Sequence, residues 1–314
     1  MYGLRRCASS TVFISGITCR LHGEIVVYLK GFDKIREKLP GYPGKKLAIL
    51  PLAGIIVGIL GYIFLIIIDL LPRLYSDIWL LVTIEPYLPV IGSFFIAWLA
   101  LYLIWGLWNK RDEMKQLYGE LAYQKMIIRG VSGVSLAISV VAHTFTSVRS
   151  LTPDGPANPL TRELSTSITL HLGIVPEIEL WIRVLLGGVF FLLALLTIRS
   201  AILTFGFDYM IVIYLYFPEE SEIQEHEIYS VLRHPTYLGG ILFGISGFFF
   251  RFSVYSAILC LIVILLFRTQ IWKEEKELVD RFGEGYIEYR KRVPAFLVRP
   301  SKLGAYFRFL RMRQ

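Results

Sequence analysis

The chain alternates long apolar runs with short polar segments. Four apolar runs lie before residue 205, and each is close to the roughly 20 residues that a transmembrane helix needs. The few charges within these runs lie near their ends or beside prolines. The pattern predicts an all-α fold, a polytopic membrane helical bundle, with spans at 47–71, 78–108, 131–148 and 180–203.

The pattern changes in the last third of the chain. The segment 204–208 contains Gly206 and interrupts the helical pattern. Two apolar runs follow at 237–250 and 253–272, and the first is too short to cross a bilayer easily. We therefore expect a C-terminal helical hairpin that begins partway into the membrane. Residues 273–297 are charged and aromatic, which predicts cytoplasmic C-terminal helices.

Composition and charge exclude a soluble globular protein and a nucleic-acid-binding protein. Of the 314 residues, 55% are apolar, and the mean hydropathy is +0.57. The net charge is +8, but the lysines and arginines cluster before the first span, in 109–125 and after Trp272. By the positive-inside rule these three segments are cytoplasmic. No nucleic-acid-reading motif accompanies the charge, so membrane lipids are the expected partners of the basic tail.

Three regions follow from these patterns. Residues 1–46 are expected to form a cytoplasmic N-terminal segment with an interfacial helix at Ile25–Lys38. Residues 47–179 would hold three spans and an external loop, and residues 180–314 the motif-bearing membrane core and basic tail. The three cysteines have neither the spacing of a metal site nor a closed set of disulfide pairs.

The first chemical motif is Arg233-His-Pro-Thr-Tyr237. Pro235 favours a helix start and biases His234 toward an extended backbone, so the imidazole can face a ligand. Tyr237 offers an aromatic face to a sulfonium or an adenine ring. The alternative is a helix start at the membrane interface, with Arg233 extended toward water and Tyr237 in the aromatic belt.

The second motif is the glutamate pair Glu274 and Glu275, directly after the second apolar run. Carboxylates there could bind an ammonium group or ribose hydroxyls through charge-assisted hydrogen bonds. Taken alone, the pair is equally typical of a solvated charged surface, because Lys273 and Lys276 flank it.

Together the motifs resemble the isoprenylcysteine carboxyl methyltransferase family, in which an RHPxY segment, a hairpin and a double glutamate build an S-adenosylmethionine site. The family pattern FGxxYxxYxxxVP follows the glutamates and is matched here by Phe282, Gly283, Tyr286, Tyr289, Val293 and Pro294. The resemblance covers roughly residues 185–297. Two positions depart from it: Glu227 stands where members usually have glycine, and Val298 replaces a proline.

The resemblance implies transfer of a methyl group from S-adenosylmethionine to a lipophilic acceptor that enters from the bilayer, either a prenylcysteine-like carboxylate or a lipid. Arg292 would hold the acceptor carboxylate beside Tyr289, although it could equally be a membrane-surface cation. Glu275 or His234 would act as a base if the acceptor were an amine or a phenol. The residues implied in cofactor binding are Tyr229, Arg233, His234, Pro235, Tyr237, Leu238, Glu274 and Glu275.

Two other functions remain open from the sequence. NADPH-dependent sterol reductases resemble the same hairpin but usually read HPNYxGE, whereas this chain has Thr236 and Gly240 in place of the asparagine and the acid. A transporter or scaffold is the second alternative, because Glu85 lies within an apolar run. His143 in the third span is expected to be a satisfied helix histidine rather than a ligand.

Overall fold

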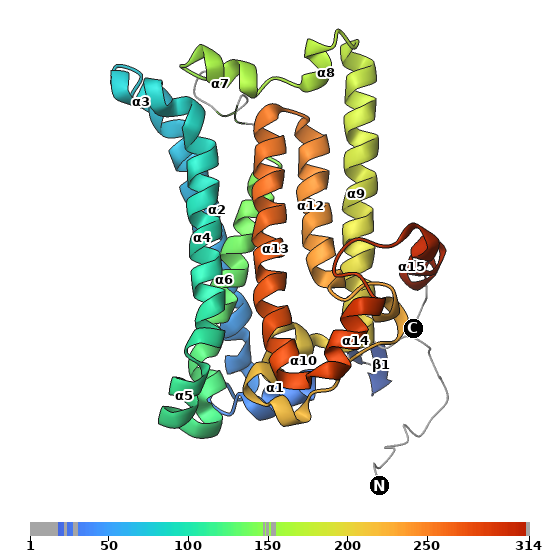
Figure 1. Cartoon of the computed structure of the whole chain (residues 1–314). Helices are drawn as coiled ribbons and strands as arrows, with labels where there is room; N and C mark the ends of the chain where they lie inside the picture. The colour runs from blue at the N-terminus through green and yellow to red at the C-terminus, as the bar shows by residue number, and fades with distance from the viewer. Residues whose placement is uncertain are drawn as a thin grey trace.

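The computed structural model describes residues 18–21, 24–27, 31–146, 148, 151 and 155–311. Long helices run up and down through the molecule, and shorter helices cover both of its ends (Figure 1). The long helices are α2 (Ile49–Leu74), α4 (Leu88–Asn109), α6 (Ala122–His143), α9 (Pro176–Phe205), α12 (Pro235–Arg251) and α13 (Val254–Phe282).

Shorter elements connect these helices. The end at which α13 finishes holds α1 (Phe32–Lys38), α5 (Arg111–Tyr118), α10 (Phe207–Met210), α11 (Ile213–Tyr216), α14 (Glu284–Arg292) and α15 (Leu303–Arg311). The opposite end holds α3 (Trp79–Ile84), α7 (Pro159–Leu164) and α8 (Ile168–His171). Single 3-10 turns are η1 (Gly44–Ala48), η2 (Glu85–Tyr87), η3 (Gly119–Leu121), η5 (Pro218–Glu220), η6 (Glu227–Ser230) and η7 (Pro300–Lys302).

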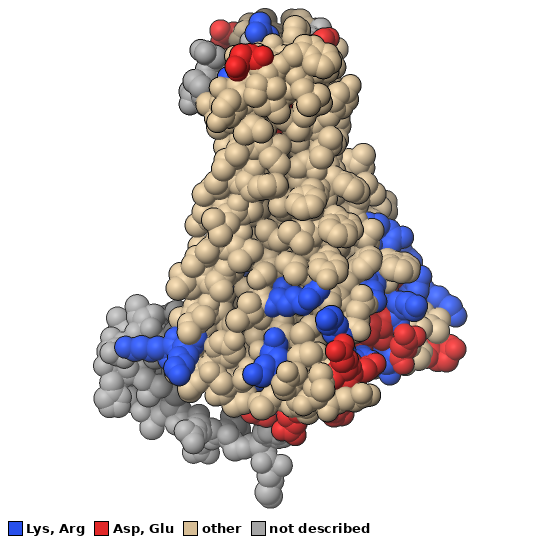
Figure 2. All heavy atoms as spheres, turned by 90° about the vertical axis from the view of Figure 1, so that its left-hand side faces the viewer, with Lys and Arg blue, Asp and Glu red and all other residues tan. Residues whose placement is uncertain are grey.

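The predicted polytopic helical bundle is confirmed. Within the described residues, 5 helical segments are long and apolar enough to cross a membrane, so the chain is an integral membrane protein. The middle of the molecule is almost free of charged side chains in Figure 2. Helix α12 has 17 residues and its partner α13 has 29, which agrees with a hairpin whose first arm is short.

The predicted bounds of the third span are wrong. Helix α6 covers Ala122–His143 rather than 131–148, because Tyr123 and Met126 are buried in the core near α11 and extend the helix toward that end. The second span, predicted at 78–108, is confirmed as the candidate membrane span Trp79–Asn109, although the 3-10 turn η2 interrupts its regular helix at Pro86.

The helix expected over Ile25–Lys38 is wrong in its first half. Glu24–Val27 forms strand β2, which pairs antiparallel with β1 (Thr18–Leu21), and α1 begins only at Phe32. The run Ile25-Val-Val favours a strand because β-branched side chains fit an extended backbone better than a helix. Gly31, with φ of 84°, then turns the chain into α1.

Close helix packing holds the hairpin in place. Helix α12 lies between α9 and α13, and glycines on α12 let its neighbours approach. A Cβ atom added at Gly239 would lie 2.3 Å from Ile198 of α9, and one added at Gly240 would lie 2.3 Å from Phe267 of α13. The start of α12 is thus fixed against both neighbours, and this start carries the first motif.

Two buried polar clusters inside the bundle are paired. His143 is fully buried between Ser93, whose Oγ lies 2.7 Å from Nδ1, and Asp69, whose Oδ2 lies 2.9 Å from Nε2. This satisfied histidine matches the expectation from the sequence. Glu85 lies 3.6 Å from Arg73 and accepts a hydrogen bond from the backbone N–H of Asn158, so it caps the connection to α7.

Candidate active site

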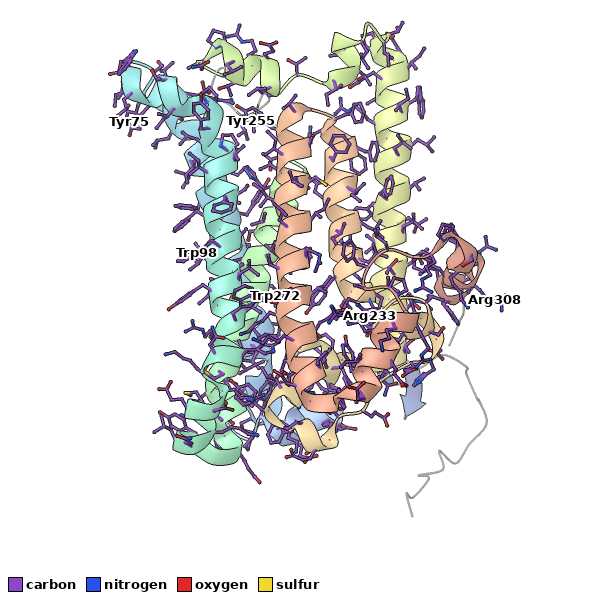
Figure 3. All side chains as sticks on the ribbon, viewed as in Figure 1. Tyr75, Trp98, Arg233, Tyr255, Trp272 and Arg308 are labelled. Carbon is purple, nitrogen blue, oxygen red and sulfur yellow. The ribbon has the colours of Figure 1, made fainter. Side chains whose placement is uncertain are left out.

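The first motif meets the end of the FGxxYxxYxxxVP pattern where α12 begins and α14 ends. The backbone N–H of Arg233 donates to the carbonyl of Pro294 at 3.0 Å, and the N–H of His234 donates to that of Ala295 at 2.9 Å. Pro235 is the first residue of α12, as its fixed φ predicts. Segments about sixty residues apart in sequence therefore lie side by side (Figure 3).

A buried ion pair forms the centre of this site. The Arg233 guanidinium contacts Glu275 Oε1, with Nε at 2.9 Å, and its Nη1 donates to the carbonyls of Arg290 and Val293. Arg233 is 8% exposed and Glu275 is 7% exposed. Removing either partner would leave an uncompensated buried charge, which typically costs about 3–5 kcal/mol. The pair therefore joins α12, α13 and α14 into one unit.

His234, Tyr237 and Glu274 form the half-open side of the site. Here His234 is buried, whereas Tyr237 and Glu274 are half-buried. His234 Nε2 lies 3.3 Å from Glu275 Oε1, and its ring stacks on Tyr237 with centroids 5.5 Å apart. The Tyr237 hydroxyl donates to Glu274 Oε2 at 2.5 Å, and its ring also contacts Phe267. Unlike Glu275, Glu274 is only half-buried. This side combines aromatic faces with a carboxylate that solvent or a ligand can reach.

The two tyrosines of the FGxxYxxYxxxVP pattern are buried beneath this surface. The Tyr289 hydroxyl donates to the carbonyl of Tyr229 at 2.7 Å, and Tyr289 is 3% exposed. Burial raises the pKa of both Tyr286 and Tyr289, so their hydroxyls stay protonated at neutral pH. The Tyr286 hydroxyl is buried and has no hydrogen-bond partner within the described part of the chain.

Arg292 lies on the surface. Its Nη2 donates to Glu225 Oε2 at 2.7 Å, and the two side chains are 62% and 36% exposed. Leu238, expected near the cofactor, packs in a core cluster with Ile228 and Leu232. The structure thus brings together Arg233, His234, Tyr237, Glu274 and Glu275, with Arg292 on an outer rim; contact of Arg292 or Tyr289 with an acceptor stays a prediction.

Three contributors to the site were not assigned from the sequence. Arg290 Nε lies 3.6 Å from Glu275 Oε2, Glu225 pairs with Arg292, and Tyr286 has the unpartnered hydroxyl. Tyr286 belongs to the FGxxYxxYxxxVP pattern, which was a usable signal. Glu225 and Arg290 lie in charged stretches where no pattern distinguishes one charge from the next.

The departure at Glu227 has a structural counterpart. Glu227 has φ of 51°, in the left-handed region that favours glycine, the residue usual at this position in the resembled family. Its Oε2 accepts a hydrogen bond from Thr204 Oγ1 at 2.6 Å. The loop into the site therefore keeps a conformation suited to glycine, and the Thr204 contact offsets part of its cost.

Fold and site define a membrane protein with a polar centre at one end of a short helical hairpin. Residues 185–280 match the isoprenylcysteine carboxyl methyltransferase (ICMT) family, which confirms the resemblance for this part of the chain. The match includes both glutamates but ends before α14, so Tyr289 and Arg292 rest on the motif and the geometry.

Curated relatives agree with this assignment. Protein-S-isoprenylcysteine O-methyltransferase B of Arabidopsis thaliana is 30% identical over 98 residues, covering 31% of this chain and 50% of that protein. The protein-S-isoprenylcysteine O-methyltransferase of Xenopus laevis is 28% identical over 141 residues, covering 41% and 46%. The chain thus spans about half the length of these relatives. No solved structure matches it.

Proposed function

We propose that the chain transfers a methyl group from S-adenosylmethionine to a lipophilic acceptor that reaches the site from the bilayer, with a prenylcysteine-like carboxylate as the leading acceptor class. The observation that carries this proposal is the joining of both family motifs around the Arg233–Glu275 pair at the end of the hairpin. The family match over residues 185–280 supports the reaction type.

The residues present fit the cofactor. It carries an ammonium group, ribose hydroxyls, an adenine ring and a sulfonium. Glu274 offers a half-buried carboxylate for the cationic or hydroxyl groups, and the stacked rings of His234 and Tyr237 offer aromatic faces. The buried Tyr286 hydroxyl supplies one more polar group that a ligand could engage. When bound, the cofactor would supply an electrophilic methyl group.

In this proposal Glu275 is a positioning residue. Its Oε1 contacts both Arg233 and His234, which fixes the imidazole and the start of α12. A carboxylate acceptor loses no proton when it is methylated, so no base is needed for it, and orientation and exclusion of water supply most of the rate. A role of Glu275 as base for an amine or a phenol stays a prediction.

Arg292 would orient the acceptor. An acceptor carboxylate would replace the Glu225 carboxylate at the Arg292 guanidinium, because the two carboxylates have the same planar geometry. The exposed pair with Glu225 costs little to break, because surface ion pairs contribute only about 0–1 kcal/mol. The transport alternative loses its support, because Glu85 is held by Arg73 and a backbone N–H.

The test is ligand-dependent thermal stability of the purified chain in detergent. S-adenosylhomocysteine should raise the melting temperature by mass action. His234→Ala and Glu274→Gln should remove this response, whereas Glu288→Gln, an exposed glutamate of α14, should keep it. Stabilisation by NADPH with no response to S-adenosylhomocysteine would favour the reductase and overturn the proposal.

A further inference from the structure

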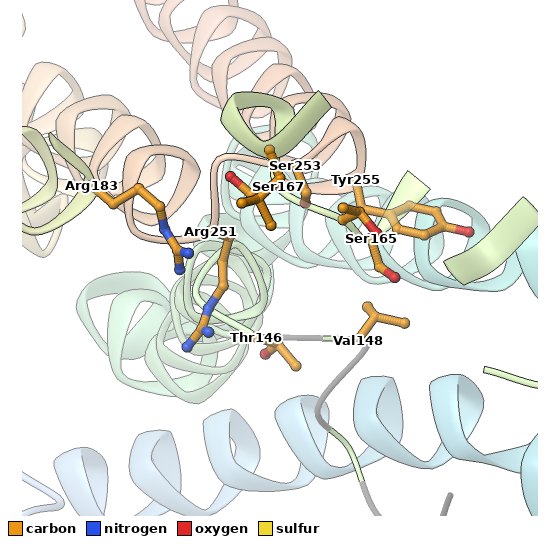
Figure 4. A pocket seen from close by; sticks show the side chains of 10 residues that line it. Thr146, Val148, Ser165, Ser167, Arg183, Arg251, Ser253 and Tyr255 are labelled. Atoms are coloured by element: carbon orange, nitrogen blue, oxygen red, sulfur yellow. The ribbon is translucent and has the colours of Figure 1, made fainter. Parts of the chain in front are cut away.

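Two adjoining cavities lie at the α7–α8 end, opposite the candidate active site. One, of about 190 Å³, is lined largely by hydroxyl groups, including those of Thr146 and Ser165 (Figure 4). The other, of about 540 Å³, is largely apolar. Arg183 and Arg251 line both cavities, so the two form one continuous site with two guanidinium groups at the junction.

The two arginines carry more positive charge than their neighbours neutralise. Arg183 donates to the Phe250 carbonyl through Nε at 2.9 Å and pairs with Glu179 at 2.8 Å. Arg251 donates through Nε to the Phe145 carbonyl. Among the described residues, Nε is the Arg251 nitrogen that donates a side-chain hydrogen bond, and the Nη atoms donate none. Among the described residues, Glu179 is the one carboxylate that pairs with either of these two guanidinium groups.

This excess charge indicates an anionic ligand. Both arginines are partly buried near an end of the bilayer, where an uncompensated cation is costly. The hydrogen bond to the Phe145 carbonyl uses only the Nε of Arg251. Its Nη groups are therefore available for a phosphate, which guanidinium groups bind through paired hydrogen bonds. Figure 4 shows both side chains reaching into the same space.

The apolar cavity identifies the kind of anion. It is lined by Phe145, Leu180, Val184 and Phe191, and its volume is within the range of about 300–1,000 Å³ typical of ligand pockets. A Cβ atom added at Gly188 would meet no atom within 4 Å, so the wall is open there. A free phosphate would not use this space, whereas an acyl chain would fill it.

We propose that this is a binding site for an anionic phospholipid of the membrane leaflet at the α7–α8 end. The phosphate lies between Arg183 and Arg251, the polar head extends toward Thr146 and Ser165, and one acyl chain occupies the apolar cavity. Basic pockets between transmembrane helices bind lipid head groups on the cytoplasmic side of membranes, and this pocket offers the same chemistry at the α7–α8 end. The site is independent of the proposed methyl transfer.

The experiment measures the melting temperature of the full chain in detergent. Added dioleoylphosphatidylglycerol should raise it by roughly 3–6 °C at saturation, whereas dioleoylphosphatidylcholine and inorganic phosphate should have little effect. An equal rise with phosphatidylcholine would mean nonspecific lipid binding, and an equal rise with phosphate would mean a free-anion site. Either result would overturn the proposal.

Paired variants locate the effect. Arg251→Gln should abolish the response to phosphatidylglycerol, whereas Arg162→Gln, at the same end but outside both cavities, should keep it. A Cβ atom at Gly188 meets no neighbour, so Gly188→Leu should place its side chain into the apolar cavity, abolish the response and leave the melting temperature without lipid nearly unchanged. Leu185→Phe, an exposed neighbour on α9, is its control. A full response in Gly188→Leu would contradict the acyl-chain cavity.

Discussion

Glu274 and Glu275 are adjacent in α13 but are placed for different tasks, because successive helix residues point about 100° apart. Glu275 turns inward to Arg233 and His234, whereas Glu274 turns toward Tyr237 and the half-open side. A double glutamate can thus supply both a structural ion pair and a ligand contact. The sequence identified the pair, but only packing distinguishes its members.

Arg292 allows substrate orientation to be separated from stability. Arg292→Ala should leave S-adenosylhomocysteine binding and the melting temperature nearly unchanged, because the side chain is 62% exposed. Methyl transfer to a prenylated cysteine analogue should fall roughly tenfold or more, about 1.4 kcal/mol of transition-state stabilisation. Arg292→Lys should rescue little, because an ammonium group cannot make the paired contact.

The control is Lys291→Ala, which removes the neighbouring exposed cation and should keep activity. If Arg292→Lys retained full turnover, Arg292 would be a surface cation. Loss of cofactor binding in Arg292→Ala would place it in the cofactor pocket instead, and the argument for a carboxylate acceptor would lose its main support.

Glu227 tests the loop that enters the site. Glu227→Gly should have a melting temperature close to that of the parent chain, because relief of the left-handed backbone offsets loss of the Thr204 hydrogen bond. Glu227→Val should be less stable by about 2–3 kcal/mol, since a β-branched residue disfavours this backbone further. Glu222→Val, an exposed position without positive φ, should change little. Equal stability of Glu227→Val and Glu227→Gly would contradict this account.

At the scale of helices, backbone contact at glycines determines how closely α4 and α6 pack. A Cβ atom added at Gly133 would lie 2.9 Å from the Ala100 carbonyl oxygen and 3.0 Å from the Ile104 nitrogen. Because backbone atoms cannot rotate away, Gly133→Ala should cost about 1–3 kcal/mol and lower the melting temperature by several degrees. Gly188→Ala, which meets no atom, is the matched control. An unchanged melting temperature in Gly133→Ala would show that the helices separate easily.

Hydropathy predicted the long helices because lipid requires every backbone group to be satisfied within the element. It failed where protein contacts decide the structure. The first turns of α6 read as a polar loop, yet Tyr123 is fully buried against the α11 region. The strand β2 needed its pairing with β1, which no helical pattern reveals.

At the scale of the whole molecule, the motifs predicted which segments form the site, and tertiary contacts added the rest. Arg233 and Glu275 were both named from the sequence, but their ion pair depends on the hairpin bringing α12 beside α13. The contacts of Arg290 and Glu225 join charged stretches that carry no distinguishing pattern. They could be found only in three dimensions.

The two ends of the molecule also differ in charge, and this difference predicts the orientation of the chain in the membrane. In Figure 2 the lysines and arginines gather mainly at the end that carries the C-terminal helices, and few lie at the α7–α8 end. By the positive-inside rule, the basic end is expected to face the cytoplasm, where S-adenosylmethionine is available. We therefore predict that α14 and α15 face the cytoplasm and α7 faces the opposite side.

Cysteine labelling would test this orientation in a background where Cys7, Cys19 and Cys260 are replaced by serine or alanine. A cysteine at Leu160, an exposed position of α7, should react with a membrane-impermeant maleimide in intact cells. A cysteine at Lys302 should react only after permeabilisation, because Lys302 directly precedes α15, which lies away from the end that carries α7. External labelling at Lys302 would put the Arg233–Glu275 site on the side without cofactor, and the proposed methyl transfer could not operate there.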